Sequence, residues 1–490
     1  MKLDFMEPFV KFLPEIAPPQ RPPHLKEKLG WTVGALLIFF IMYHVYPVGL
    51  NASAFSAPGQ QFLQVVTASK MGSLITSGIG PIILASIFLQ LFMGAKLIEV
   101  DTRDQKQRAI FHGTQKLLAI LLSFFEAAIF VNVPGVQQAL LGVAPGTFAL
   151  FGSVGFTALF VIFQFAMGSI ILLYLDEIVS KYGIGSGISL FIAAGVSLAV
   201  VQGTIYLLFN ADVGALGKLQ SGGADAIPQA LLALLPLAFT VVVFLACTYA
   251  EGIKVEIPLS FERARGFIGR FPLKFLYVSN IPVILASALL LNLQVASQLF
   301  YNKAIVIAGT DWLPYLIHVQ ETGYGVRITD GFLYLITPLQ YSPLSLGSYT
   351  AYLEVLGTST PILGIPEYVH ALIYIVSLTV MCVVFGRFWI ETTGMGPRDV
   401  AENLNKSGMQ LPGFRRDPRI VEKVLEKYIP TITILGSIFV GLLASFADLT
   451  GALGTGTGIL LTVGILHKMY EDLSAQHMFD MYPELRKFVE

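Results

Sequence analysis

The chain alternates between long apolar stretches and shorter polar ones. A transmembrane helix needs about 20 mostly apolar residues, and ten stretches are long enough. The pattern therefore predicts an all-α polytopic membrane protein. Its ten spans are expected at residues 30–49, 79–98, 117–135, 150–174, 184–209, 230–249, 275–299, 368–390, 430–449 and 454–470.

The stretch TASKMGSLITSGIGP, residues 67–81, interrupts this pattern at the start of the second span. Gly72 and Gly78 each weaken a helix by about 1 kcal/mol relative to alanine, and Pro81 favours a break before it. The sequence predicts a weak polar segment set against a firm apolar helix. The alternative is an outer loop with some helical turns.

Lysine and arginine positions orient the predicted bundle. With the N-terminus placed inside, 27 of the 31 basic residues fall in inner segments, and only Lys70, Lys218, Lys303 and Arg327 fall outside. This asymmetry is a strong positive-inside signal, so both termini are predicted to be cytosolic. The inner segments are 1–29, 96–116, 175–183, 250–274, 387–429 and 467–490.

Composition supports a membrane protein, because only 13% of the residues are charged against about 25% in soluble domains. The N-terminus has prolines at 8 and 14 and no continuous apolar core, so it is not a cleavable signal. Phe5, Phe9 and Phe12 recur at helical spacing, which predicts a short helix lying on the membrane surface.

Two inner connections are longer than topology alone requires. Alternation in residues 251–275 predicts an extended hairpin with a protruding tip, and residues 391–429 are basic at their turn. Ordinary positive-inside loops would explain the charge but not the length. The loops therefore favour an anionic docking partner, either ribosomal RNA or anionic lipid. The outer connection, residues 300–367, is too long to lack secondary structure, so we expect short helices or a cap there.

The sequence offers no convincing catalytic, metal or nucleotide motif. GALGTGTG at 451–458 lacks the Lys-Ser/Thr of a phosphate loop and favours close helix packing. No histidines have HxxxH or HExxH spacing, and Cys247 and Cys382 are interpreted as small buried side chains. Glu126 is the chief ionisable group within a span and a functional candidate. We expect no cofactor and favour a passive conduit over a secondary transporter or an intramembrane hydrolase.

Four stretches carry motifs of a known family: ITSGIGPIILASI, YLDEIVSKYGIGSGISLFIAAGV, KFLYVSNIPVILASALL and GALGTGTGILLTVGI. They resemble the SecY family, the large subunit of the Sec protein translocon, and its archaeal and eukaryotic branch more than the bacterial one. The resemblance covers nearly all ten spans but not the outer loop. It implies a passive channel that passes unfolded secretory polypeptides across the membrane and releases transmembrane segments sideways into lipid. A docked partner such as the ribosome would drive it.

The resemblance also implies two five-helix halves, related as an inverted repeat around a central pore, with a re-entrant plug half-helix. Within the sequence, little beyond Pro81 and Pro282 in the second span of each half hints at this repeat. The implied domains are a cytosolic amphipathic segment at 1–29, an N-terminal half at 30–209 with the plug at about 67–78, an outer connection at 210–229, a C-terminal half at 230–470 with cytosolic loops 250–274 and 391–429 and outer loop 300–367, and a cytosolic tail at 471–490.

Motif alignment then assigns a pore and a plug. A narrow aliphatic ring sheds water, which blocks ions, and offers a passing peptide no hydrogen bond or charge. The alternative is that the aliphatic residues assigned to the ring are ordinary packing residues of apolar helices. The implied ring is Ile79, Ile83, Ile188, Ile192, Ile284 and Leu461. The implied plug, which re-enters from outside and sits on the ring, includes Thr67, Ser69, Lys70, Gly72, Ser73, Thr76 and Gly78.

A lateral gate is implied between spans two and three on one side and spans seven and eight on the other. Its polar residues would be Ser86, Glu126 and Asn280, although Leu84 stands where the family often has a polar residue. Asn280 has an alternative role as a helix cap or backbone-bonding residue beside Pro282. The implied ribosome-docking residues are Arg263, Arg265, Arg270, Lys274, Arg415 and Arg416.

The resemblance further implies partners and a location. The partners would be a small clamp subunit of the SecE type, a second small subunit, the ribosome, signal sequences with their nascent polypeptides, and membrane lipid. The chain is expected in the plasma membrane, with both termini in the cytosol.

Overall fold

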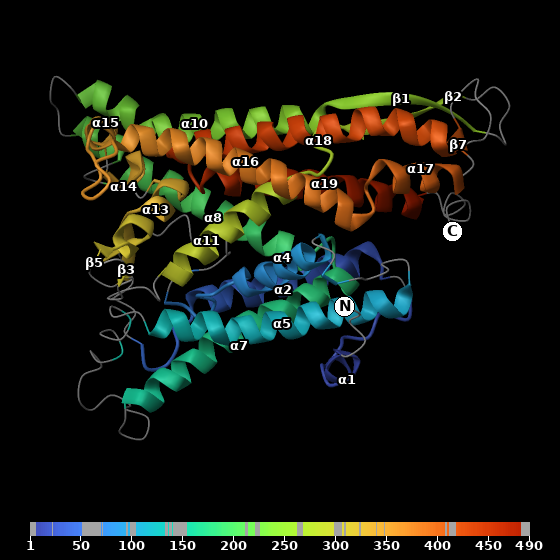
Figure 1. Ribbon diagram of the computed structural model, residues 1–490, viewed down its shortest axis with the longest axis horizontal. Coiled ribbons are helices and arrows are strands. Elements are labelled where there is room, and N and C mark those ends of the chain that lie inside the picture. The colour runs from blue at the N-terminus through green and yellow to red at the C-terminus, as the bar shows by residue number, and fades with distance from the viewer. Residues whose placement is uncertain are drawn as a thin grey trace.

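Within the described residues of the computed structural model, a helix lies at each of the ten places where the apolar pattern predicts a span. Figure 1 shows how these helices are arranged. Six of the described helices are long and apolar enough to cross a membrane, and Gly80–Met93 and Ile281–Gln294 are shorter apolar helices. The predicted all-α, ten-helix architecture is confirmed. The structure describes residues 6–21, 23–50, 70, 72–94, 97–98, 104–132, 136, 140, 154–210, 214–220, 226–261, 268–297, 306–307, 310–322, 325–339, 341–346, 348–406, 409–410 and 418–481.

The first group of helices packs around α7. Helix α7 contacts α2, α5 and α8, while α5 also contacts α4. The predicted N-terminal surface helix is a single turn, α1 (Glu7–Val10), which contacts α5 and leaves Phe9 and Phe12 exposed. The long helices of this group are α2 (Leu25–His44), α4 (Gly80–Gly94), α5 (Gln105–Val131), α7 (Val154–Tyr182) and α8 (Gly187–Phe209).

The second group packs around α18 and α19. Helix α18 contacts α16 and α19, α16 contacts α11, and α19 contacts α10. Figure 1 shows this group as a separate layer from α2, α4, α5 and α7. Its helices are α10 (Ala226–Gly252), α11 (Ile281–Ser297), α16 (Glu367–Thr393), α18 (Pro418–Leu449) and α19 (Gly456–Met481), with the shorter α9 (Ala215–Gln220) and α17 (Pro397–Lys406).

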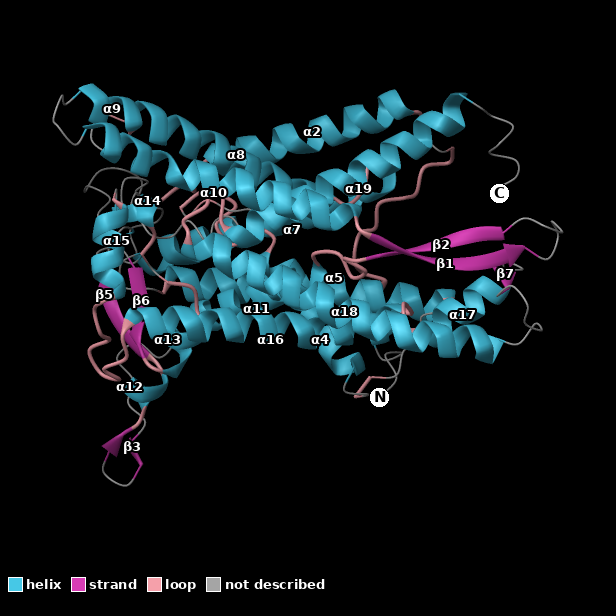
Figure 2. Ribbon diagram, turned by 90° about the horizontal axis from the view of Figure 1, so that it is seen from above, coloured by secondary structure: helices cyan, strands magenta, loops and turns pink. Residues whose placement is uncertain are grey.

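One end of the bundle, called here the hairpin end, carries a three-stranded sheet (Figure 2). Strands β1 (Lys254–Phe261) and β2 (Ile268–Lys274) form the predicted hairpin, with Ile257 opposite Phe271. Strand β7 (Met409–Gln410) adds to β1 through the Ser260–Gln410 pair. The two long basic loops therefore share one sheet, which their separate sequences did not reveal.

The opposite end carries a cap built from residues 306–356, which confirms the predicted short helices or cap (Figure 2). A buried network joins the cap to α16. Tyr334 donates to Glu367 Oε1 at 2.7 Å, while His370 lies 2.8 Å from Glu367 Oε2 and 3.0 Å from the Thr337 carbonyl. The cap contains β3 (Val306–Ile307), β4 (Thr310–Asp311), α12 (Leu313–Leu316), β5 (His318–Thr322), β6 (Gly325–Asp330), α13 (Phe332–Ile336), α14 (Pro343–Leu346) and α15 (Tyr349–Leu356).

Candidate functional site

The six predicted ring residues come together in the largest apolar cluster of the described residues. Four of them are buried side chains of that cluster, and Ile188 and Ile284 are partly buried and pack against it. They reach it from α8, α11, α19 and the segment at the start of α4. Both groups of helices therefore contribute to one aliphatic cluster, which also contains buried residues such as Ile75 and Val196.

The two groups begin their second helix in the same way. Three residues before Pro81, Gly78 has a φ of +53°, and three residues before Pro282, Ser279 has the same φ of +53°. A left-handed φ is uncommon outside glycine, so a matching turn ahead of two prolines is a specific likeness. Ring residues Ile83 and Ile284 each follow their proline by two positions. This likeness supports the inverted repeat that the sequence barely shows.

The two groups also begin their fifth helix in the same way. Asp176, near the end of α7, accepts from the Ile188 amide at 2.8 Å in the first turn of α8. Asp448, near the end of α18, accepts from the Gly456 amide at 2.7 Å where α19 begins. A carboxylate satisfies the free N–H groups at a helix start and complements the helix dipole. Sequence reasoning missed both residues, although each precedes a glycine-rich join.

Residues 72–78 of the predicted plug, with ring residue Ile79 directly after them, fold as successive turns. The amides of Ser73, Thr76 and Gly78 donate to the carbonyls of Lys70, Ser73 and Ile75 at 3.0, 3.1 and 2.9 Å. The Ser73 and Thr76 hydroxyls also donate to carbonyls three residues back, at 2.7 and 2.6 Å. The polar side chains that looked suited to water are thus used inside the segment, which is almost wholly buried.

Two contacts hold this segment against α2. The Leu74 amide donates to the Val45 carbonyl at 2.8 Å, at the end of α2. The Lys70 ammonium lies 5.5 and 5.4 Å from the ring centres of Tyr43 and Tyr46, within cation–π range. The predicted plug residues Thr67 and Ser69 lie outside the described residues, so a half-helix there stays a prediction.

The predicted lateral gate coincides with a contact seam between the two groups. Helix α4 contacts α11 and α16, and α5 contacts α11. The gate's polar residues are not joined to one another by any hydrogen bond in the described part of the chain. Ser86 accepts from Gln90 at 3.1 Å, Glu126 is buried with its Oε1 unpaired, and Asn280 donates to the Leu460 carbonyl at 2.6 Å. In the structure, Asn280 therefore takes the backbone-bonding role that was the alternative to a polar gate contact.

The predicted docking residues divide between described and undescribed segments. Lys274 donates to both carboxylate oxygens of Glu471 on α19, at 2.8 and 2.6 Å, so its charge is paired within the molecule. This hydrogen bond holds the pKa of Glu471 below its usual range. Arg270 lies on β2, opposite Pro258, and only its backbone is described. The remaining four, Arg263, Arg265, Arg415 and Arg416, lie outside the described residues.

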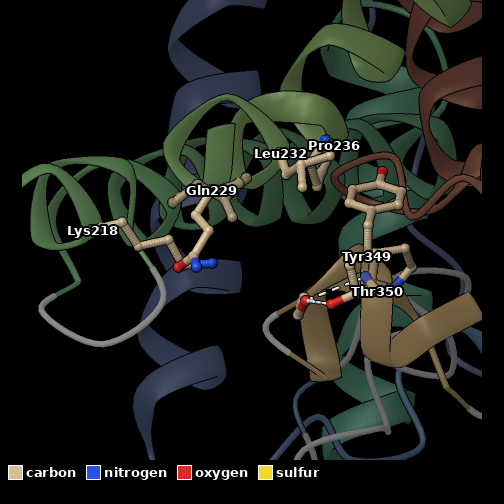
Figure 3. A pocket seen from close by; sticks show the side chains of 10 residues that line it. Lys218, Gln229, Leu232, Pro236, Tyr349 and Thr350 are labelled. Carbon is tan, nitrogen blue, oxygen red and sulfur yellow. Dashed lines mark hydrogen bonds between the residues drawn. The ribbon is translucent and has the colours of Figure 1, made fainter. Parts of the chain in front are cut away.

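A separate cavity of about 240 Å³ lies at the cap end, away from the ring. Figure 3 shows Lys218 and Gln229 from α9 and α10 on one wall, and Tyr349 and Thr350 from α15 on the other. Tyr349 donates to the Thr450 carbonyl at 2.6 Å, and burial raises the pKa of Tyr349 to about 12, which keeps this donor protonated. The cavity wall is thus tied to the turn before α19.

Comparison with known proteins relates this geometry to one family. The family model SecY matches residues 73–470. Protein translocase subunit SecY of Methanocaldococcus jannaschii is 40% identical over 486 residues, which cover 98% of each chain. A solved SecY structure, in which the plug domain stabilises the closed state of the translocation channel and maintains a membrane seal, has a TM-score of 0.75 at 38% identity, with 98% of each chain covered. Sec61 in the canine ribosome-channel complex has a TM-score of 0.74 at 39% identity, also covering 98% of each chain.

Proposed function

The chain belongs to the SecY family of protein translocase subunits, and from this membership we propose that it is the pore-forming subunit of a Sec translocon. Its task is to conduct unfolded polypeptides across a membrane as a passive, non-catalytic channel. The observation that carries the proposal is the aliphatic cluster, to which both helix groups contribute ring residues at matching positions.

The ring explains how one channel can pass many sequences and still block ions. Aliphatic side chains cannot replace the water around an ion, so a narrow apolar constriction is impermeable to ions. They also form no hydrogen bond or ion pair that would hold a passing peptide. Residues 72–79 act as the seal at rest, because they are buried and pack in the same cluster through Ile75.

Sideways release would use the seam where α4 and α5 meet α11 and α16. Apolar packing holds this seam, and the buried carboxyl of Glu126 has no hydrogen bond that ties it to the opposite side in the described residues. Separation of the seam therefore breaks no polar bond of this residue. An apolar signal segment entering there would exchange one apolar contact for another, at little cost in free energy.

We assign the hairpin end to the cytosol and to partner docking. One sheet unites strands from both basic loops, so the described parts of the two loops lie together at this end. The ribosome is the docking partner, its phosphates paired with Arg263, Arg265, Arg415 and Arg416. The assembly includes a SecE-type clamp and a second small subunit, in the plasma membrane with both termini cytosolic.

Site-specific crosslinking tests the channel. A photoreactive residue at Ile83 or Ile188 should crosslink to a stalled nascent secretory chain. The same residue at Leu245, which is exposed on α10, is the matched control and should crosslink to lipid instead. Nascent-chain contacts that avoid both ring positions but form elsewhere on the subunit would refute this path.

A further inference from the structure

Three residues meet one helical turn beyond Leu461, on the hairpin side of the ring. Asn280 donates its amide to the Leu460 carbonyl at 2.6 Å. A Cβ at Gly464 would lie 2.0 Å from that amide nitrogen and 3.1 Å from Glu251 Oε1. The Asn280 amide and the Glu251 carboxyl therefore face the same point of α19, and only a glycine leaves room for both.

Both polar side chains are deeply buried, with 4% of Glu251 and 4% of Asn280 exposed. Glu251 Oε1 and Asn280 Oδ1 have no hydrogen-bond partner among the described residues. The amide is thus held by one hydrogen bond and by close packing on α10 and α19. Losing that packing would leave little to keep Asn280 on the Leu460 carbonyl.

The position of this cluster links three parts of the channel. Glu251 lies in the last turn of α10, directly before the hairpin. Asn280 immediately precedes α11, whose first turn carries ring residue Ile284 and whose length contacts α4 and α5 across the seam. Lys274, at the other end of the hairpin, is tied to Glu471 of the same helix α19. The residues before and at the end of the hairpin therefore both lie against α19, Glu251 by packing beside Gly464 and Lys274 by its bond to Glu471.

We propose that Glu251 and Gly464 are positioning residues that keep Asn280 on the Leu460 carbonyl, and so hold the first turn of α11 in its resting place beside the ring. The inference rests on the proposed function, because it concerns how easily the channel opens. When Asn280 leaves Leu460, α11 loses its polar tie to α19. The seam with α4 and α5 then opens at a lower cost.

Gly464→Ala tests the proposal, because its methyl group would displace the Asn280 amide. Gly252→Ala is the matched control, since nothing lies within 4 Å of a Cβ at Gly252. The assays are ion leak in sealed vesicles and secretion of a reporter with signal segments of graded hydrophobicity. G464A should raise the leak about fivefold, the effect of one lost hydrogen bond, and should accept less apolar signals. G252A should match wild type.

A double-mutant cycle separates positioning from general damage. Asn280→Ala removes the amide that G464A would strike, so adding G464A to N280A should change neither leak nor signal threshold. Additive effects in the cycle, or equal effects of G464A and G252A, would overturn the proposal.

Glu251 provides a second route if G464A fails to accumulate. Glu251→Ala should relax the signal threshold only when Asn280 is present. Glu251→Gln keeps the size and shape of the side chain that lies beside Gly464, so its threshold should match wild type. A relaxed threshold in E251Q, or an effect of E251A that persists in the N280A background, would count against the inference. Wild-type secretion in the same vesicles separates this outcome from failure of the channel itself.

Discussion

Truncation of Ile75 measures how firmly the seal is held. Ile75 is fully buried in the aliphatic cluster, and cutting a buried isoleucine to alanine costs about 2–5 kcal/mol. If the segment leaves its seat when the channel opens, this cost falls on the closed state alone. Even the lower value shifts the open-to-closed ratio by about 30-fold, since 1.4 kcal/mol is a factor of ten. Ile75→Ala should therefore raise ion leak in sealed vesicles by at least one order of magnitude.

The controls separate loss of the seal from loss of stability. Ile328→Ala removes a buried isoleucine of the cap, outside the ring cluster, and should lower thermal stability without raising leak. Deletion of residues 67–76 removes most of the seal and should give the highest leak. A tight Ile75→Ala channel, or a leak matched by Ile328→Ala, would show that residues 72–79 do not seal the pore.

Three further predictions concern the hairpin end. Charge reversal of Arg265 and Arg415 should weaken ribosome binding and flatten its salt dependence without altering thermal stability, and unchanged affinity across a salt series would remove the docking assignment. The pKa of Glu471 is lowered, so its pairing with Lys274 stabilises the fold above the usual glutamate pKa and is lost as pH falls through the lowered value. Both side chains are partly exposed, so Glu471→Gln should remove under about 1 kcal/mol of stability at pH 7 in denaturant titrations, and progressively less as the pH is lowered. Glu177 accepts hydrogen bonds from two lysines and from the Ile16 amide, so Glu177→Ala should release the N-terminal segment at a cost of about 2–3 kcal/mol. The release should be seen as faster proteolysis within residues 7–19, and unchanged proteolysis would show that other contacts hold that segment.

The apolar pattern located every long helix, but several helices extend beyond the predicted spans. Helix α18 begins at Pro418 rather than near residue 430, and α5 begins at Gln105 rather than near residue 117. The reason is physical: hydropathy marks the part of a helix that lies in lipid, whereas hydrogen bonding continues the helix into water. Asp104, which caps α5 by accepting from the Lys106 amide, is the kind of local signal that places a true end.

The sequence predicted the candidate site less completely than it predicted the fold. Motif resemblance supplied the six ring positions, because an isoleucine in an apolar helix carries no signal of its own. It could not show that Asn280 bonds to Leu460, nor that Lys274 is paired with Glu471, because these partners are 180 and 197 residues away. Long-range pairs of this kind depend on how the helices are assembled, which no local pattern records.

The two aspartates that cap the last helix of each half, Asp176 and Asp448, form a repeat that is present in the sequence but hard to recognise there. YLDEIVSKYGIGSG and FADLTGALGTGTG each place an aspartate before a glycine-rich join that opens the last helix of a half. The joins differ in length, so aligning the halves residue by residue does not bring them together. In the structure Asp448 lies next to the cap, where Tyr349 reaches Thr450. Asp176 lies beside Glu177, which holds the N-terminal segment. The same aspartate-to-helix contact therefore occurs at opposite ends of the bundle. This requires that one half be inverted relative to the other, because a parallel repeat would place both aspartates at the same end.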